Sequence, residues 1–123
     1  MKKIITVLII ALLMTTTIKA SGTEEVKRVR CTCYLPTGNK TYSGVYPYEG
    51  IIAASKDRLG QTAAVYNEDM TFIGYFECRD IGGHKGLKNG TRIDVYRETS
   101  AGVKEWAREH GDYVYIKWIE GAG

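Results

Sequence analysis

The sequence has no apolar run of the roughly 20 residues that a membrane-spanning helix requires. Its longest run, Ile4–Met14, is interrupted only by Thr6 and follows two lysines. A positive start followed by about 7–15 apolar residues is typical of a secretory signal. Small residues from Ala20 onward predict cleavage after Ala20, so residues 1–20 are expected to be removed. An uncleaved N-terminal anchor is the alternative. No cysteine lies beside the run to carry a lipid.

The chain also lacks a basic excess outside this first segment. Its 123 residues hold 17 Lys and Arg against 14 Asp and Glu, but residues 1–20 contain three of the lysines and no acidic residue. The remaining chain therefore carries 14 charges of each sign. That balance does not indicate a nucleic-acid partner, because such partners usually select a basic surface. We expect a monomer that does not stably insert in a membrane after cleavage.

Cysteine is scarce, and its count of three is odd. Export permits disulfides, but three cysteines leave at least one thiol over. Cys31 and Cys33 point to one face of a strand and do not bridge each other, whereas Cys78 can pair with one of them. A zinc site with His84 is conceivable, although the C-x-C spacing is too tight for the usual patterns. We predict buried free thiols without metal, with a disulfide as the alternative.

Alternating apolar and polar residues, separated by turn residues, predict a mainly β domain. The expected strands are Val26–Leu35, Ile51–Ala54, Gln61–Tyr66, Thr71–Cys78, Arg92–Tyr96 and Asp112–Ile119. Two long Gly-rich loops, Pro36–Tyr48 and Ile81–Thr91, interrupt them. Many short strands in a chain of this size predict a small closed barrel.

One helix is expected, over Thr99–His110. Thr99 or Ser100 can cap its start, and Gly111 stands where a helix C-terminus favours glycine. The residues expected on its apolar face recur at helical spacing: Val103, Trp106, Ala107 and His110. Trp106 and Trp118 are expected in the core.

Two aspartates stand out by their surroundings. Asp94 lies inside the otherwise apolar strand Arg92–Tyr96, where a charged group must point outward, pair or become protonated. Asp80 precedes Ile81-Gly82-Gly83, and glycines there allow the backbone to approach a ligand closely. Two acids in one cleft can divide into a protonated and an ionised group, as glycosidic cleavage requires. The simpler readings are a solvent-facing strand residue and a turn-initiating residue.

Several short motifs occur in a fixed order along the chain. They are Cys31-Thr32-Cys33-Tyr34 with Thr37-Gly38, Thr41 with Ser43-Gly44, Gly50-Ile51-Ile52-Ala53-Ala54, Leu59-Gly60, Asp80-Ile81-Gly82-Gly83 and Arg92-Ile93-Asp94-Val95-Tyr96. Together they resemble the three-aspartate (3D) domain of bacterial cell-wall proteins, a barrel shared with the membrane-bound lytic transglycosylase A family. The Asp80 and Asp94 motifs are the specific part, and the resemblance runs from about Val29 to Ile119.

This resemblance implies a double-psi β-barrel of about six short strands over residues 29–123, after a polar lead-in at 21–28. It implies a secreted or wall-associated protein that cleaves the MurNAc–GlcNAc bond of peptidoglycan to a 1,6-anhydro product, without cofactor or metal. It assigns Asp94 as the catalytic acid and Asp80 as its support. The residues expected to contact the glycan lie on the two Gly-rich loops: Thr37, Ser43, Tyr46, Gly82, Gly83, His84 and Lys88.

The chain departs from the family pattern at one acid. Ser55 stands where the first of the three aspartates usually lies, and Asp57, two residues on, can substitute only if the turn is remodelled. The loop between Asp80 and Asp94 is also longer than in the pattern. These departures favour the alternative of a non-catalytic glycan-binding module. A protein–protein adaptor that uses the barrel only as a scaffold is a further alternative.

Overall fold

The structure is a computed structural model that describes residues 25–119. The expected signal, its cleavage point and the first half of the lead-in lie outside the described residues. Within the described range, none of the helices has the length and apolar character needed to cross a membrane.

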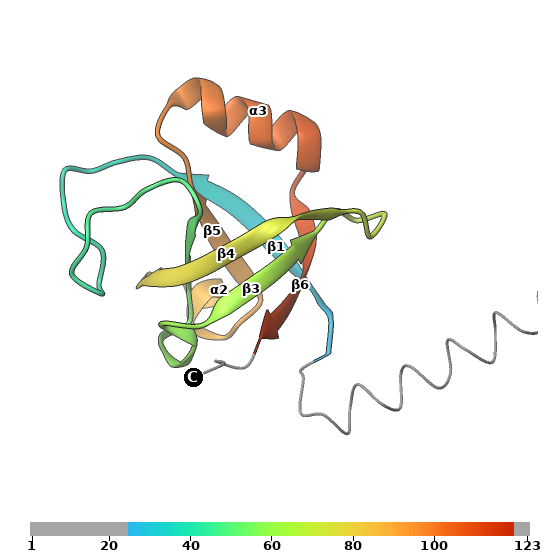
Figure 1. Cartoon of the computed structure of the whole chain (residues 1–123), viewed down its shortest axis with the longest axis horizontal. Coiled ribbons are helices and arrows are strands. Elements are labelled where there is room, and N and C mark those ends of the chain that lie inside the picture. Colours follow the sequence, from blue (N-terminus) through green and yellow to red (C-terminus); the bar gives the residue numbers. More distant parts are fainter. Residues whose placement is uncertain (1–24, 120–123) are drawn as a thin grey trace, which may run out of the picture.

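Six strands close into a barrel in the order β1-β5-β2-β4-β3-β6, with β6 paired back to β1 (Figure 1). Their bounds are β1 Lys27–Tyr34, β2 Ile51–Ala54, β3 Thr62–Tyr66, β4 Phe72–Ile81, β5 Arg92–Tyr96 and β6 Tyr113–Ile119. β1 with β5 and β2 with β4 are parallel pairs, and the other four pairs are antiparallel. The prediction of a small, mainly β barrel is therefore confirmed.

Strand alternation sorts the side chains between the interior and the outer face of the barrel. On β1, Val29 and Cys31 are buried in the core, and on β6 so are Val114, Ile116 and Trp118. Ile52, Val65 and the other core residues come from every strand, so burial of their apolar surface stabilises the whole closed sheet. On both strands the buried residues are every second one, which is the alternation of apolar and polar residues that predicted the strands.

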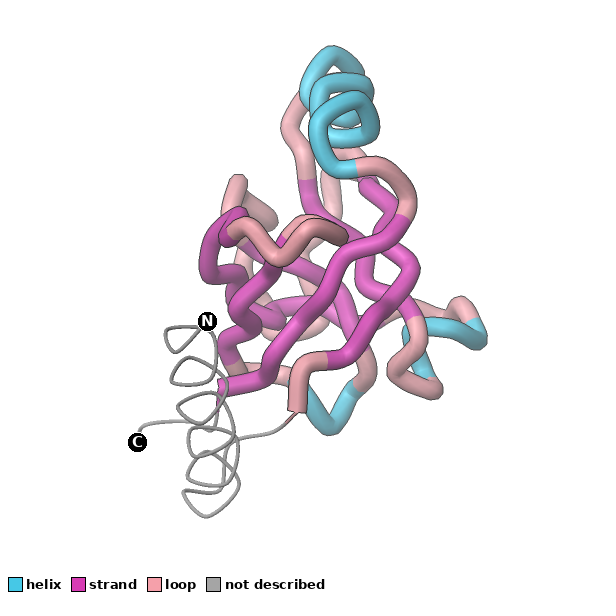
Figure 2. Tube along the Cα trace, turned by 90° about the vertical axis from the view of Figure 1, so that its right-hand side faces the viewer, coloured by secondary structure: helices cyan, strands magenta, loops and turns pink. Residues whose placement is uncertain are grey.

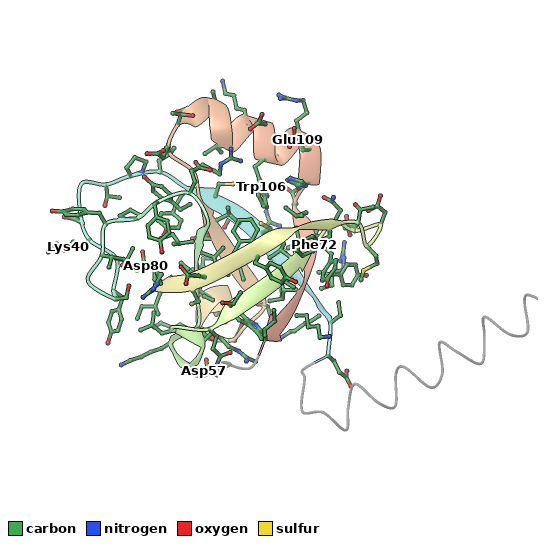
Figure 3. The ribbon with its side chains drawn as sticks, in the orientation of Figure 1. Lys40, Asp57, Phe72, Asp80, Trp106 and Glu109 are labelled. Carbon is green, nitrogen blue, oxygen red and sulfur yellow. The ribbon has the colours of Figure 1, made fainter. Side chains whose placement is uncertain are left out.

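The predicted helix is present as α3, Ser100–His110, and lies across the upper end of the barrel (Figures 1 and 2). Thr99 caps it by accepting a hydrogen bond from the Gly102 amide at 3.0 Å. Trp106 is 5 % exposed and points from α3 into the core (Figure 3). Ala107, expected on the same face, is instead exposed, because the helix contacts the barrel along a narrow stripe.

Two further short helices correct the prediction of a single helix. The four-residue α2, Lys85–Lys88, interrupts the loop expected at Ile81–Thr91, and a 3-10 helix, η1, covers Lys56–Arg58. The Nδ1 atom of His84 caps α2 by accepting from the Gly86 amide at 2.9 Å. Leu87 is 2 % exposed, and α2 packs against β5 and β2. Tertiary packing of one leucine therefore stabilises a helix too short to show a periodic pattern.

The long segment 35–50 leaves the barrel as a broad loop, at the left in Figure 1. It is anchored near its middle and near its end. The Ser43 amide donates to the Arg79 carbonyl at 3.2 Å, and Glu49 forms an ion pair with Arg97 at 3.0 Å. Ile51 and Ala53 at its end are buried although they alternate with the core residues Ile52 and Ala54. The connecting segments thus cover part of the outer face of β2.

Candidate functional site

Strand register brings Asp80 and Asp94 to one row on the outer face of the barrel. Ala53 on β2 pairs with Asp80 on β4 at one side and with Asp94 on β5 at the other. Asp94 in turn pairs with Thr32 on β1, so the row crosses four strands. Neighbouring strands lie about 4.8 Å apart, which separates the two aspartate Cα atoms by roughly 10 Å.

Asp94 is held by two polar side chains. Its Oδ1 accepts hydrogen bonds from the Thr32 hydroxyl and from Arg92, whose Nη2 and Nε lie 3.0 Å and 3.2 Å away. The Arg92 Nε also donates to Thr32 Oγ1 at 2.9 Å. The Asp94 side chain is only 15 % exposed. Thr32 and Arg92 therefore fix the position of one carboxylate oxygen of Asp94.

Asp80 is fixed mainly by the backbone of the segments around it. Its Oδ1 accepts from the amides of Tyr42 and Ile81, each at 3.0 Å. β4 extends to Ile81, three residues beyond the predicted end at Cys78, so Asp80 is the next-to-last residue of the strand. The carboxylate therefore ties the 35–50 loop to β4, and Figure 3 places it on the side of the barrel where that loop lies.

Tyr34 holds the second oxygen of Asp80. It is the last residue of β1, two residues after Thr32 on the same face, and its hydroxyl donates to Asp80 Oδ2 at 3.3 Å. Burial, and after it the charges of Asp80 and Asp94, raises the pKa of the Tyr34 hydroxyl well above its usual value. Tyr34 therefore remains a hydrogen-bond donor to Asp80 at neutral pH.

The residues predicted to contact a glycan divide into two groups. Ser43 lies beside Asp80 through its amide contact with Arg79, while Gly82 and Lys88 line one cavity of about 340 Å³ with Ser55 and Asp57. Thr37, Tyr46, Gly83 and His84 are exposed. The Thr37 hydroxyl accepts from the Asn39 amide, and the Tyr46 ring lies 5.6 Å from Lys40 Nζ. The contacts of Thr37 and Tyr46 lie within their own loop.

Gly82 has a packing role that the sequence did not reveal. A Cβ atom there would lie 2.3 Å from Cδ1 of Leu87, the leucine that holds α2 against the barrel. Gly83, by contrast, would place its Cβ in open space. The first glycine of the motif is therefore required by the fold, whatever the second does for a ligand.

Ser55 and Asp57 lie together at the lower end of the barrel, where Figure 3 labels Asp57. The Ser55 hydroxyl donates to Asp57 Oδ1 at 2.6 Å, and this hydrogen bond lowers the pKa of Asp57. Both residues line the 340 Å³ cavity and a second one of about 190 Å³. Neither cavity is lined by Asp80 or Asp94, so the turn at η1 does not place Asp57 in the row of the two predicted catalytic acids.

The three cysteines all lie among the described residues and form no disulfide. Cys31 and Cys78 are buried as predicted, whereas Cys33 is half-buried. Burial raises the pKa of Cys31 to about 12 and that of Cys33 and Cys78 to about 11, so all three are thiols at neutral pH. Between residues 25 and 119 no group of three metal-binding side chains comes together, and His84 is on an exposed turn away from the interior cysteines.

The chain matches no protein-family model and no curated protein. Sequence reasoning selected the two aspartates but missed Thr32, Tyr34 and Arg92 as their partners. The alternation of side chains along a strand could have identified these partners. It places Thr32 with Tyr34 on the polar face of β1, and Arg92 with Asp94 on the polar face of β5.

Proposed function

We propose that this chain acts on the glycan strands of peptidoglycan, cleaving the MurNAc–GlcNAc bond in the manner of a lytic transglycosylase. The observation that carries the proposal is the shared register of Asp80 and Asp94 against Ala53, with the Tyr34 hydroxyl bound to Asp80. The resemblance to the three-aspartate domain gives this pair its expected roles. The finer fold type, a double-psi barrel, belongs to the same proposal and is supported by the two parallel strand pairs.

The reaction requires one group that gives and then takes a proton. Protonated Asp94 donates to the glycosidic oxygen as the bond between that oxygen and muramyl C1 breaks. The C6 hydroxyl of the same muramyl residue then attacks C1, and its proton returns to Asp94. A bond between C1 and O6 forms, no water is consumed, and the product is a 1,6-anhydro sugar. Asp80 stabilises the positive charge that develops at C1, and Tyr34 holds Asp80 in place.

The ion pair between Arg92 and Asp94 sets a condition on this mechanism. Arg92 Nη2 lies 3.0 Å from Asp94 Oδ1, so the guanidinium occupies this oxygen in the free chain. For Asp94 to donate to the glycosidic oxygen, the guanidinium must first bind another group. The bound substrate is the natural source of that change, because the free chain holds Arg92 on Asp94.

A non-catalytic glycan-binding module is the second candidate function. It is favoured by the same ion pair and by the three hydrogen bonds that Asp80 accepts, which leave both carboxylates well satisfied without substrate. Ser55 in place of the first family aspartate points the same way. In this case the row would bind and orient a sugar without cleaving its glycosidic bond.

Digestion of purified sacculi by the wild-type protein and by Asp94→Asn distinguishes these functions. Asparagine keeps the acceptor that Thr32 and Arg92 use but cannot transfer a proton. Because general acid–base catalysis contributes about 10²–10⁴-fold, we expect Asp94→Asn to lower release of anhydro-muropeptides by at least about 100-fold. Asp80→Asn should reduce release less. Mass spectrometry of the released fragments identifies the anhydro product.

Asp112→Asn is the matched control, because Asp112 is an exposed turn residue outside the row. It should release as much product as the wild type, and all three variants should still co-sediment with sacculi. Equal release by wild type and Asp94→Asn would eliminate Asp94 as the catalytic acid. Binding of sacculi by a wild-type protein that releases no fragments would establish the binding module instead.

A further inference from the structure

A cleft with an excess of basic side chains is lined by Arg92, the residue that forms an ion pair with Asp94. Its volume is about 190 Å³, and it opens at the end of the barrel where β1 and β5 begin and where β2 and β6 end. Four cationic residues and two acidic residues line this basic cleft: Lys27, Arg58, Lys88 and Arg92, with Glu25 and Asp57. Neither the role of Asp94 nor the covered face of β2 requires such a concentration of positive charge.

The four cations come from four separate elements, so their meeting is a property of the fold. Lys27 begins β1, and its Nζ lies close to Gly90, where an added Cβ would be 3.5 Å away. Arg58 ends η1, donates to Gln61 Oε1 at 3.1 Å and lies 5.1 Å from the Trp118 ring centre. Like charges around a small cleft repel one another, and a bound anion removes that repulsion.

Arg92 belongs to both the basic cleft and the row of acids. Its Nε and Nη2 bind Thr32 and Asp94, while its second terminal nitrogen, Nη1, takes no part in those bonds. The guanidinium is planar and presents its donors in a fixed fork, which suits a carboxylate. Arg92 and Asp94 are two residues apart on β5, or about 6.8 Å along the strand. One muramyl residue can therefore reach both.

We propose that the basic cleft is a subsite for a carboxylate carried by the muramyl residue, and that Arg92 links occupation of this subsite to Asp94. The inference rests on the proposed function, because it assumes a muramyl ring beside Asp94. The muramyl lactyl group ends in a carboxyl that is either free or extended by peptide, and peptides bring carboxylates of their own. One small cleft with two acids in its lining suits a single carboxylate better than a polyanion. An anion that engages Arg92 weakens the hold of the guanidinium on Asp94.

Binding of a small probe tests the subsite without requiring catalysis. N-acetylmuramic acid carries the free carboxylate, and its methyl ester has the same shape without the charge. In amide NMR titrations of the purified protein, we expect the acid to bind at least about tenfold more tightly than the ester, because a charged acceptor forms the stronger hydrogen bonds. The double variant Lys27→Gln/Lys88→Gln should lose this preference, while Lys104→Gln on the exposed side of α3 should keep it.

The link through Arg92 has its own readout. The ¹³C signal of the Asp94 side-chain carboxyl should shift when the acid is added to the wild-type protein. It should not shift with the ester, nor with the acid in the Lys27→Gln/Lys88→Gln variant. A shift caused equally by acid and ester would overturn the link, because only the carboxylate can compete for the guanidinium.

Sedimentation with glycan strands identifies the source of the carboxylate. Preference for peptide-free strands indicates the lactyl carboxyl, and preference for peptide-bearing strands indicates a peptide carboxyl. Equal binding of acid and ester, or no binding of the acid, overturns the subsite even if sacculi are cleaved. If sacculi are not cleaved but the acid still binds by way of Lys27 and Lys88, the subsite stands and the cleavage proposal fails.

Discussion

Tyr34 shows how much of the candidate site depends on a single hydroxyl. Its strand, β1, is separated from β4 by β5 and β2, yet the side chain reaches Asp80 across them. Its ring also packs edge-on against Tyr96, with centroids 5.4 Å apart. The ring contact fixes the direction of the side chain, and the hydroxyl then fixes the carboxylate, so that Asp80 is positioned from three segments of the chain.

The contribution of this contact can be measured by a double-mutant cycle. Removal of the hydroxyl in Tyr34→Phe should lower the free energy of unfolding by about 1 kcal/mol, because a half-buried carboxylate loses a donor. In the background Asp80→Asn the same change should cost less. Tyr48→Phe is the control, since its hydroxyl donates to Glu77 on an exposed surface and its loss should stay within about 0.5 kcal/mol. Urea unfolding gives the free energy of unfolding of the wild type, the two single variants and the double variant. Additive effects of Tyr34→Phe and Asp80→Asn would contradict the coupling.

Some residues of the candidate site could be predicted from the sequence, and others could not. Asp94 was visible because a charge inside an apolar strand is unusual, and Arg92 shares its face by simple alternation. The contact of Tyr34 with Asp80 could not be predicted, because it depends on the order of four strands around the barrel. The same is true of Lys27 and Lys88, which meet at the basic cleft although 61 positions separate them in the chain.

At the scale of the element, the segment between β4 and β5 depends on the close packing of Gly82 against Leu87. Because Leu87 is 2 % exposed, its side chain has little room to move away from a new methyl group. We expect Gly82→Ala to lower the free energy of unfolding by about 1–3 kcal/mol, as overpacking of a filled interior usually does. Neither Gly82 nor Gly83 has a positive φ, so backbone strain does not enter the comparison.

Gly83→Ala is the matched control for this prediction. It changes the neighbouring glycine in the same motif, where a methyl group meets open space, and its effect should lie within about 0.5 kcal/mol. Denaturant unfolding measures both variants. Equal destabilisation by the two would show that the segment needs glycine for conformational freedom and not for packing against Leu87.

The elements themselves were predicted well where a local pattern defines them. The bounds of β2 and β5 were predicted to the residue, and α3 followed from its cap and its single buried tryptophan. α2 was not predictable, since four residues carry no period, and its cause is the contact of Leu87 with the strands beneath it. The extension of β4 to Ile81 was missed for a similar reason, because pairing with Ala54 on β2 prolongs it.

The whole molecule depends on closure between the ends of the chain. β1 pairs with β5 and β6, which lie far from it in the sequence. The paired residues Thr32 and Asp94 are 62 positions apart, and the paired residues Val29 and Val114 are 85 positions apart. β6 also pairs with β3, where Val65 faces Ile116. Without β6, both β1 and β3 would keep an open edge. β6 therefore closes the sheet, and its residues complete the interior that the other strands line.

A charge on the inner face of β6 should for this reason unfold the entire domain and not a local segment. Ile116 is 2 % exposed in the core, so Ile116→Lys buries an unpaired ammonium and should lower the free energy of unfolding by more than about 4 kcal/mol. Tyr115→Lys, one residue away on the outer face, should still unfold in one cooperative transition. Tryptophan fluorescence during urea unfolding reports on both variants, because Trp106 and Trp118 lie in the core at α3 and β6. If Ile116→Lys unfolds cooperatively near the wild-type midpoint, closure by β6 is not what holds the barrel together.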